Sequence, residues 1–219
     1  MSGAEPSAER AGRIASWRKA GSTHHATQHT MLRPFRSAPQ RMVWLLLLAL
    51  LAGPLGAAAG DAWVSIDTRA GVLSVVQGST VMLKLENIAI GRDGAADVHT
   101  MGAYQTPRGE FQIAWVNKHS PFRLFFGLNY PTLRHARVAY SRGLIGEGVL
   151  ETIERASADG GLPPQNSPLG GGIGIHGLGK GDPGIHRLFN WTEGCVALTN
   201  EQIDQLAPWV AIGTRVVIE

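Results

Sequence analysis

Residues 173–200 read IGIHGLGKGDPGIHRLFNWTEGCVALTN, and they carry the strongest signals of fold and site in the chain. The run 170–176 predicts a short buried strand, with glycines where the backbone must approach a neighbour closely. Cys195, the single cysteine of the 219 residues, directly follows Gly194. A thiol nucleophile needs a base, hydrogen-bond donors for an oxyanion and a rigid mount. The stretch therefore predicts a cysteine-dependent catalytic site.

Three residues around Cys195 are candidates for the remaining roles. His176 ends the predicted strand and is the candidate base, and we expect its imidazole to lower the thiol pKa from its ordinary value of ~8.5. The amides of Gly194 and Cys195 are the candidate donors to an oxyanion. Thr192 is expected to orient the histidine or to line the pocket. His186 is the alternative base, but it sits in a predicted loop, which holds a base less firmly than a strand does.

Short strands predominate in the rest of the chain. Apolar and polar residues alternate from residue 61 to about residue 90, with glycines at the expected turns. Residues 111–116 form another β-rich run. Residues 122–130 are apolar and aromatic and end before a proline, which suits a strand at a sheet edge or beside a cleft. Residues 214–218 predict a last strand.

Two segments predict short helices. Residues 149–156 form one candidate. Residues 199–202 (TNEQ) have capping-box spacing, and apolar residues follow them on one helical face. We therefore predict a mainly β fold with one or two short helices, formed as a single domain by residues 61–219.

The first 60 residues have a different character. They hold 7 of the 20 Lys and Arg residues but only 2 of the 17 acidic residues, so the net charge of +3 belongs to this segment. The remainder is slightly acidic, which argues against a nucleic-acid partner. Residues 42–60 combine preceding arginines, an apolar run and small residues, which predicts a secretory signal peptide cleaved near Ala59. An uncleaved membrane anchor is the alternative. Residues 1–41 are polar and aperiodic, so we expect a disordered extension, or a true start further along the chain.

Four blocks resemble one known family. His176, 15 intervening residues and TEGC at 192–195 resemble the active-site signature of the L,D-transpeptidase (YkuD-like) catalytic domain. That signature is His, a spacer of similar length, Ser or Thr, any residue or His, Gly and Cys. Residues 105–111 (QTPRGEF) are similar to the family's T-P-x-G-x-F turn and strand. Residues 128–131 (LNYP) and 190–192 (NWT) resemble its YafK-like Gram-negative branch. The likeness runs from about residue 62 to residue 219.

The resemblance implies a β-sandwich-like fold whose site combines a cysteine, a histidine and a backbone carbonyl. We expect that carbonyl near residues 177–179, where the sequence alone does not single it out. The implied activity is periplasmic L,D-transpeptidation, in which Cys195 attacks the third residue of a peptidoglycan stem peptide and His176 acts as general base and acid. The expected substrate-binding residues are Thr192, Gly177, Asn129, Tyr130 and Trp191. No metal or cofactor is implied.

The expected partners are peptidoglycan stem peptides and, as a further acceptor, a wall-anchored protein. We expect the chain to act as a monomer. If water takes the thioester instead of an amine, the chain is an L,D-carboxypeptidase or amidase. If the fold has lost its activity, the chain is an inactive scaffold that binds the cell wall.

Two positions depart from the family pattern. Glu193 stands where many members have histidine, and Ala197 stands where many have an arginine associated with holding the stem peptide. Arg108, Arg123 and Arg187 are candidates to supply a cation in its place, although each is more typical of a solvated surface charge.

Overall fold

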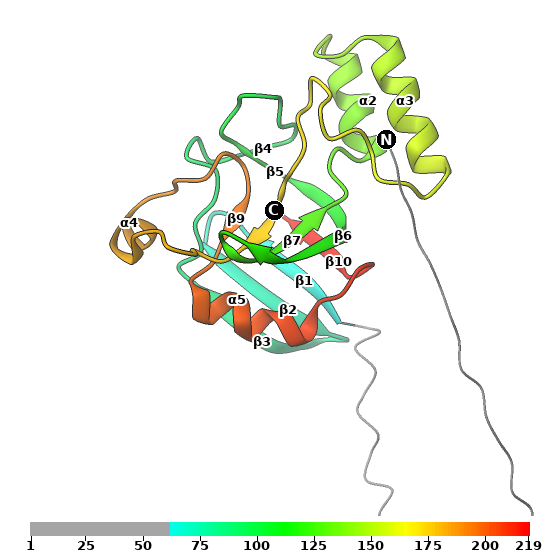
Figure 1. Cartoon of the computed structure of the whole chain (residues 1–219). Helices are drawn as coiled ribbons and strands as arrows, with labels where there is room; N and C mark the ends of the chain where they lie inside the picture. The colour runs from blue at the N-terminus through cyan, green and yellow to red at the C-terminus, as the bar shows by residue number, and fades with distance from the viewer. Residues whose placement is uncertain (1–61) are drawn as a thin grey trace, which may run out of the picture. The chain divides into compact units, whose positions relative to one another are not determined.

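The computed structural model describes residues 62–219, which form a mainly β domain, as predicted (Figure 1). The predicted extension (1–41) and signal peptide (42–60) lie outside the described residues. In chain order the elements are β1 (Ala62–Asp67), β2 (Val72–Gln77), β3 (Thr80–Glu86), β4 (Ala95–Ala96), β5 (Thr106–Pro107), β6 (Gly109–Ser120), β7 (Arg123–Leu128), α2 (Leu133–Ser141), α3 (Glu147–Ala158), β8 (Gly174–His176), α4 (Pro183–Leu188), β9 (Val196–Ala197), α5 (Asn200–Leu206), the 3-10 helix η2 (Ala207–Trp209) and β10 (Arg215–Ile218). Within residues 62–219, no helix has the length and apolar character that a bilayer span requires.

The first three strands form an antiparallel meander at one edge of the main sheet. Alternate residues of β1 are buried, including Val64 and Ile66, because successive side chains of a strand point to opposite faces. The turns at Gly71 and Gly78 have φ values of 66° and 59°, a region that glycine enters without steric cost. The alternation predicted from the sequence is confirmed here.

The main sheet has eight strands in the order β3-β2-β1-β10-β6-β7-β8-β9. The long strand β6 links its two halves, because β6 pairs with β10 near its start and with β7 further along. Isolated bridges join Ala89 to Ala197 and Gly91 to Thr192, so the segment after β3 meets the opposite edge strand β9. Side chains from both halves share one hydrophobic core. This closure gives the domain the sandwich-like form that was expected.

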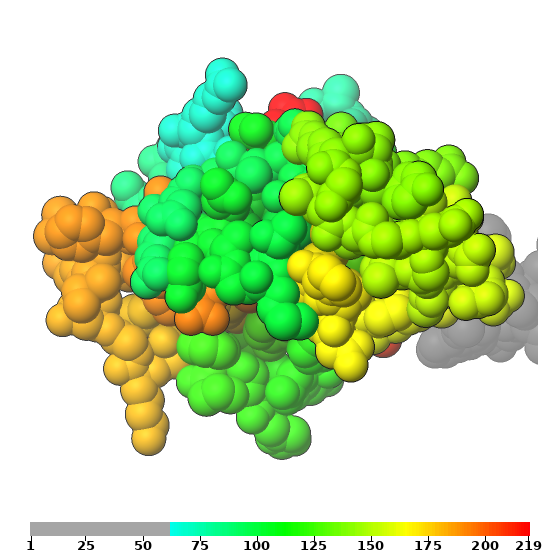
Figure 2. Space-filling model, turned by 90° about the horizontal axis from the view of Figure 1, so that it is seen from above, coloured from blue at the N-terminus to red at the C-terminus, as the bar shows by residue number. Residues whose placement is uncertain are grey.

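The described residues contain four short α-helices, two more than the upper number predicted. α2 and α3 pack on each other at one end of the domain, and α4 lies at the other (Figures 1 and 2). The sequence did not reveal α2 because its buried residues are His135, Ala136 and Ala139, which give no apolar stripe. α5 begins with the predicted capping box, in which Thr199 and Gln202 satisfy each other's backbone amides.

Two predicted strands differ in the structure. Of the two alternatives for β7, the edge position is wrong, because β8 pairs along its free side, with Phe125 opposite His176. The place beside a cleft is confirmed, because Phe125 lines a cavity. β8 is limited to residues 174–176, whereas residues 170–173 form a loop. Gly170 and Gly172 have φ values of 72° and 66°, a conformation that a regular strand does not contain.

Candidate active site

Cys195, directly before β9, and His176, at the end of β8, lie at the wall of one cavity. His176 ends β8, and β9 begins directly after Cys195. The parallel pairing of Ile175 with Val196 brings the two segments side by side. Both residues line a cavity of about 710 Å³, which we call the Cys195 cavity. The structure therefore brings the predicted nucleophile and base to the same space on paired strands, the mount that precise positioning requires.

His176 is held by a backbone carbonyl next to it. Its side chain is buried, and Nδ1 lies 2.7 Å from the carbonyl oxygen of Gly177. Since a carbonyl only accepts, Nδ1 carries the proton and Nε2 keeps its lone pair. The tautomer is therefore the one in which Nε2 can remove a proton. Gly177 supplies the third member that the sequence could place only within residues 177–179.

Aromatic rings fix the plane of the His176 imidazole. Phe125 stacks on it at 5.8 Å between centroids with an interplanar angle of 5°, and Phe122 lies at 4.3 Å. Trp191 meets it edge-on at 5.9 Å. Trp191 Nε1 in turn donates a hydrogen bond to His186 Nδ1 over 3.3 Å. Trp191, predicted as a binding residue, lines the cavity and also packs against the His176 ring.

Burial disfavours the charged forms of both Cys195 and His176. Burial lowers the pKa of His176, and the nearby His186 lowers it further. Burial raises the pKa of the half-buried Cys195 thiol to about 11, and the charge of Glu193 also raises it. The pKa of the thiol is thus raised, and not lowered as expected, because burial is the largest effect on it. The Cys195 Sγ instead donates to the carbonyl oxygen of Gly172 over 3.4 Å.

The turn before Cys195 is tied together by Thr192. Its hydroxyl donates to the carbonyl oxygen of Cys195 over 2.6 Å and accepts from the amide of Gly194 over 3.2 Å. Thr192 lines the cavity, as expected, but its hydroxyl holds the turn and makes no hydrogen bond to His176 among the described residues. Since the Gly194 amide is used in this way, the prediction that it faces an oxyanion does not hold in this structure. The Cys195 amide has no acceptor within residues 62–219 and remains the candidate donor.

Gly194 has a structural reason to be glycine. Its φ is 127°, and a Cβ there would lie 3.0 Å from the carbonyl oxygen of Gln105 and 3.1 Å from His99 Nδ1. A side chain at this position would therefore strain the backbone and displace the cavity wall. Glycine is thus required at position 194 by the backbone conformation of the turn, whereas the prediction concerned its amide.

Asn129 and Tyr130 are not part of the Cys195 cavity, contrary to the prediction. Asn129 pairs with Gln112 through its side chain and backbone on the far side of β7. Tyr130 is fully buried, and its hydroxyl bonds both the amide and the carbonyl of His99. The segment turns inward after β7, so the aromatic side chain serves the core and fixes His99.

His99 is a cavity residue that the sequence did not reveal. It is buried, its Nδ1 lies 2.9 Å from the carbonyl oxygen of Gln105, and it lines the cavity with Cys195. Burial lowers its pKa. It lies almost 100 residues before the cysteine in a loop, so neither spacing nor periodicity points to it. His186, the alternative base, does not line the cavity, because α4 turns it toward Trp191.

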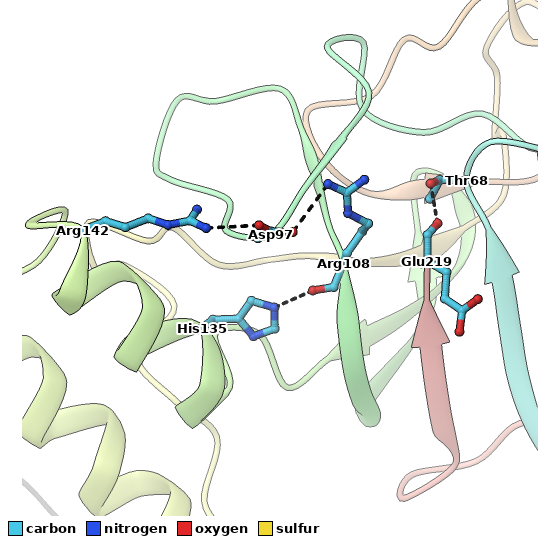
Figure 3. Close-up of polar contacts among 6 residues, drawn as sticks. All are labelled: Thr68, Asp97, Arg108, His135, Arg142 and Glu219. Carbon is cyan, nitrogen blue, oxygen red and sulfur yellow. Dashed lines mark hydrogen bonds and ion pairs between the residues drawn. The ribbon is translucent and has the colours of Figure 1, made fainter.

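The three candidate arginines are also outside the cavity lining. Arg108 contacts Asp97, whose other oxygen is held by Arg142 over 3.1 Å (Figure 3). Arg123 forms a two-pronged ion pair with Asp204. Arg187 projects from α4 and is exposed. None of these side chains replaces the family arginine.

Ala197 occupies a closed position. It is fully buried and lies between His176 of β8 and Ala89 of the segment after β3. No part of the Ala197 side chain reaches the Cys195 cavity. The position that carries an arginine in many members therefore supplies no cation to the Cys195 cavity.

A protein family and several solved structures resemble this chain. Residues 61–218 match the model of the YkuD family, the L,D-transpeptidase catalytic domain. The chain is similar in structure to the helical cell shape determining protein Pgp2 from Campylobacter jejuni, with 22% identity and a TM-score of 0.48 over 73% of this chain and 47% of that one. It is also similar to Bd1075 of Bdellovibrio bacteriovorus, with 21% identity and a TM-score of 0.46 over 73% of this chain and 48% of that one.

An L,D-transpeptidase from Xylanimonas cellulosilytica matches with 17% identity and a TM-score of 0.41, over 80% of this chain and 68% of that one. The chain spans about half the length of the Pgp2 and Bd1075 structures. No curated protein matches the sequence.

Proposed function

Because the chain belongs to the L,D-transpeptidase catalytic domain family, we propose that it is a cysteine acyltransferase that acts on peptidoglycan stem peptides. One observation carries the proposal: the only thiol of the chain and a histidine with an open Nε2 line the same cavity. The location that goes with this activity is the periplasm, and the signal peptide predicted at 42–60 supports it.

The first half-reaction forms a thioester. As Cys195 Sγ attacks the carbonyl carbon of the third stem residue, its proton moves to His176 Nε2, and the Cys195 amide donates to the developing oxyanion. The carbonyl of Gly177 stabilises the resulting imidazolium through Nδ1–H. His176 then gives the proton to the leaving amine of the terminal D-alanine as the C–N bond breaks. Because burial disfavours the charged forms of both residues, we expect proton transfer to accompany attack.

The second half-reaction decides the product. The amine of another stem attacks the thioester, His176 takes the amine proton, and the Cys195 thiol is regenerated. A wall-anchored protein amine would be used in the same way. Water in place of the amine gives trimming or release of protein, the activity of an L,D-carboxypeptidase or amidase.

The test is turnover of purified muropeptides by the full chain, beside a Cys195→Ala variant of equal folded content by circular dichroism. Mass spectrometry should detect D-alanine and a cross-linked dimer with the native chain and neither product with the variant. Trimmed monomers without a dimer would identify a hydrolase. No product, together with no adduct at Cys195 after exposure to a carbapenem, would support the inactive scaffold.

A further inference from the structure

Glu193 is the one Asp, Glu, Lys or Arg among the residues that line the Cys195 cavity. It is exposed and stands two residues before the nucleophile. The other lining residues are neutral side chains, glycines and two buried histidines whose pKa values are lowered by burial. A substrate that enters this cavity therefore meets a single full charge, and that charge is negative.

The carboxylate of Glu193 has no cation of its own within residues 62–219. A parallel bridge pairs Gly91 with Thr192, so the next residues along the two segments are Arg92 and Glu193. The backbone amide of Arg92 donates to the carbonyl oxygen of Thr192 over 3.0 Å. Arg92 nevertheless makes no ion pair with Glu193. Its guanidinium lies over the ring of Tyr104, 3.2 Å from the centroid. The guanidinium of the neighbouring Arg92 is thus held on an aromatic face, and the Glu193 carboxylate stays available to a ligand.

A bare carboxylate at this place works against the nucleophile. A negative charge beside a thiol disfavours the thiolate, and Glu193 raises the pKa of Cys195 in addition to the larger effect of burial. A cation bound to the carboxylate removes that penalty. The charge is therefore a hindrance in the empty site and an advantage once a positively charged substrate is bound.

We propose that Glu193 is a specificity-determining residue that binds the side-chain ammonium of the third residue of the donor stem peptide. The inference rests on the proposed function, in which that residue presents its carbonyl to Cys195. A diaminopimelate-type or lysine-type residue carries a primary amine on its side chain, and a carboxylate pairs with such a group through a charge-assisted hydrogen bond. Binding of this ammonium selects the donor and also relieves the repulsion that opposes thiolate formation.

The test uses two tetrapeptide donors that differ only at the third residue, which is lysine in one and Nε-acetyl-lysine in the other. D-alanine release by the full chain is measured for the native protein, Glu193→Gln and the control Glu151→Gln, an exposed position on α3. We expect kcat/KM of the native chain and of Glu151→Gln to be about tenfold higher for lysine, the size of a hydrogen bond to a charged group. Glu193→Gln should lose that preference by becoming slower on lysine alone.

A second measurement separates recognition from a structural role. Iodoacetamide is a neutral reagent that alkylates Cys195. The alkylation rate should reach half its maximum at lower pH in Glu193→Gln than in the native chain, so this variant should react with iodoacetamide at least as fast as the native chain does. A full preference for lysine in Glu193→Gln, or equal rates on both donors in the native chain, would overturn the inference and leave the proposed function intact. Failure of the native chain to release D-alanine from either donor would instead overturn the proposed function and the inference with it.

Discussion

Two of the four buried histidines among the described residues lie in similar surroundings, His135 in α2 and His176 at the Cys195 cavity. Each bonds a backbone carbonyl through one ring nitrogen, His135 that of Arg108 over 2.9 Å and His176 that of Gly177 over 2.7 Å. The second nitrogen separates them. In His135 it lies 2.6 Å from the Thr132 hydroxyl, so the ring is saturated. In His176 it makes no hydrogen bond within the described residues, and the ring lines a cavity.

Burial and stacking do not distinguish the two sites. His135 stacks on Phe111 much as His176 stacks on Phe125, and burial lowers the pKa of both imidazoles. A perturbed pKa therefore does not identify a reactive histidine in this fold. His176 differs from His135 in a nitrogen left open toward the space that holds Cys195. It differs from His99, which lines the same cavity, in its place on β8, the strand that pairs with β9 directly after Cys195.

The largest expected effect is on His176. The change His176→Asn removes the base while retaining a small polar side chain, and turnover should fall about a thousandfold, within the range for loss of a general base. D-alanine release by the purified protein measures it. Thermal unfolding followed by circular dichroism provides the control, and the midpoint temperature of unfolding should change little. Activity within tenfold of the native chain would mean that another group serves as base.

The matched change at the other site should act on stability. His135→Ala leaves a cavity beneath α2 and removes two hydrogen bonds, so we expect a loss of about 3 kcal/mol in the free energy of unfolding. Urea unfolding measures it. Alkylation of Cys195 in the folded protein should keep its native rate. A loss of alkylation without a loss of stability would show that the two sites are not separate in function.

The pH dependence of stability sharpens the same contrast. Burial lowers the pKa of His135 to about 4, whereas the unfolded chain titrates near its ordinary value, so the unfolded state binds more protons between about pH 6.5 and pH 4. Stability from this residue is complete above that window and is lost as the pH falls through it. We expect the native chain to lose about 2 kcal/mol more than His135→Gln over this interval in urea titrations. Equal losses would assign the effect to the other buried histidines.

The smallest expected effect concerns the turn before the nucleophile. Thr192→Val removes the hydroxyl that joins the Gly194 amide to the Cys195 carbonyl, which should cost about 1 kcal/mol of stability. Turnover should fall by roughly tenfold, because a looser turn positions Sγ less precisely. Thr192→Ser keeps the hydroxyl and should retain most of the activity. Equal activity of the valine and serine variants would exclude this role for the hydroxyl.

Much of the fold followed from local patterns. The alternation in β1 and β2, the capping box at Thr199 and the last strand all depend on neighbours within a few residues, and each is confirmed. The mainly β class follows from them. The helix α2 did not, because tertiary packing buries His135 and two alanines there in place of an apolar stripe.

The sequence by itself also identified the candidate base and nucleophile, since the spacing of His176 and Cys195 matches the family signature. Only the tertiary structure decided that Gly177 holds the imidazole, that the Gly194 amide is occupied, that Tyr130 faces the core and that His99 enters the cavity. These facts depend on contacts between segments far apart in the chain. They arise when β6 joins the two halves of the sheet and the segment after β3 closes on β9, and no local pattern encodes the geometry of that closure.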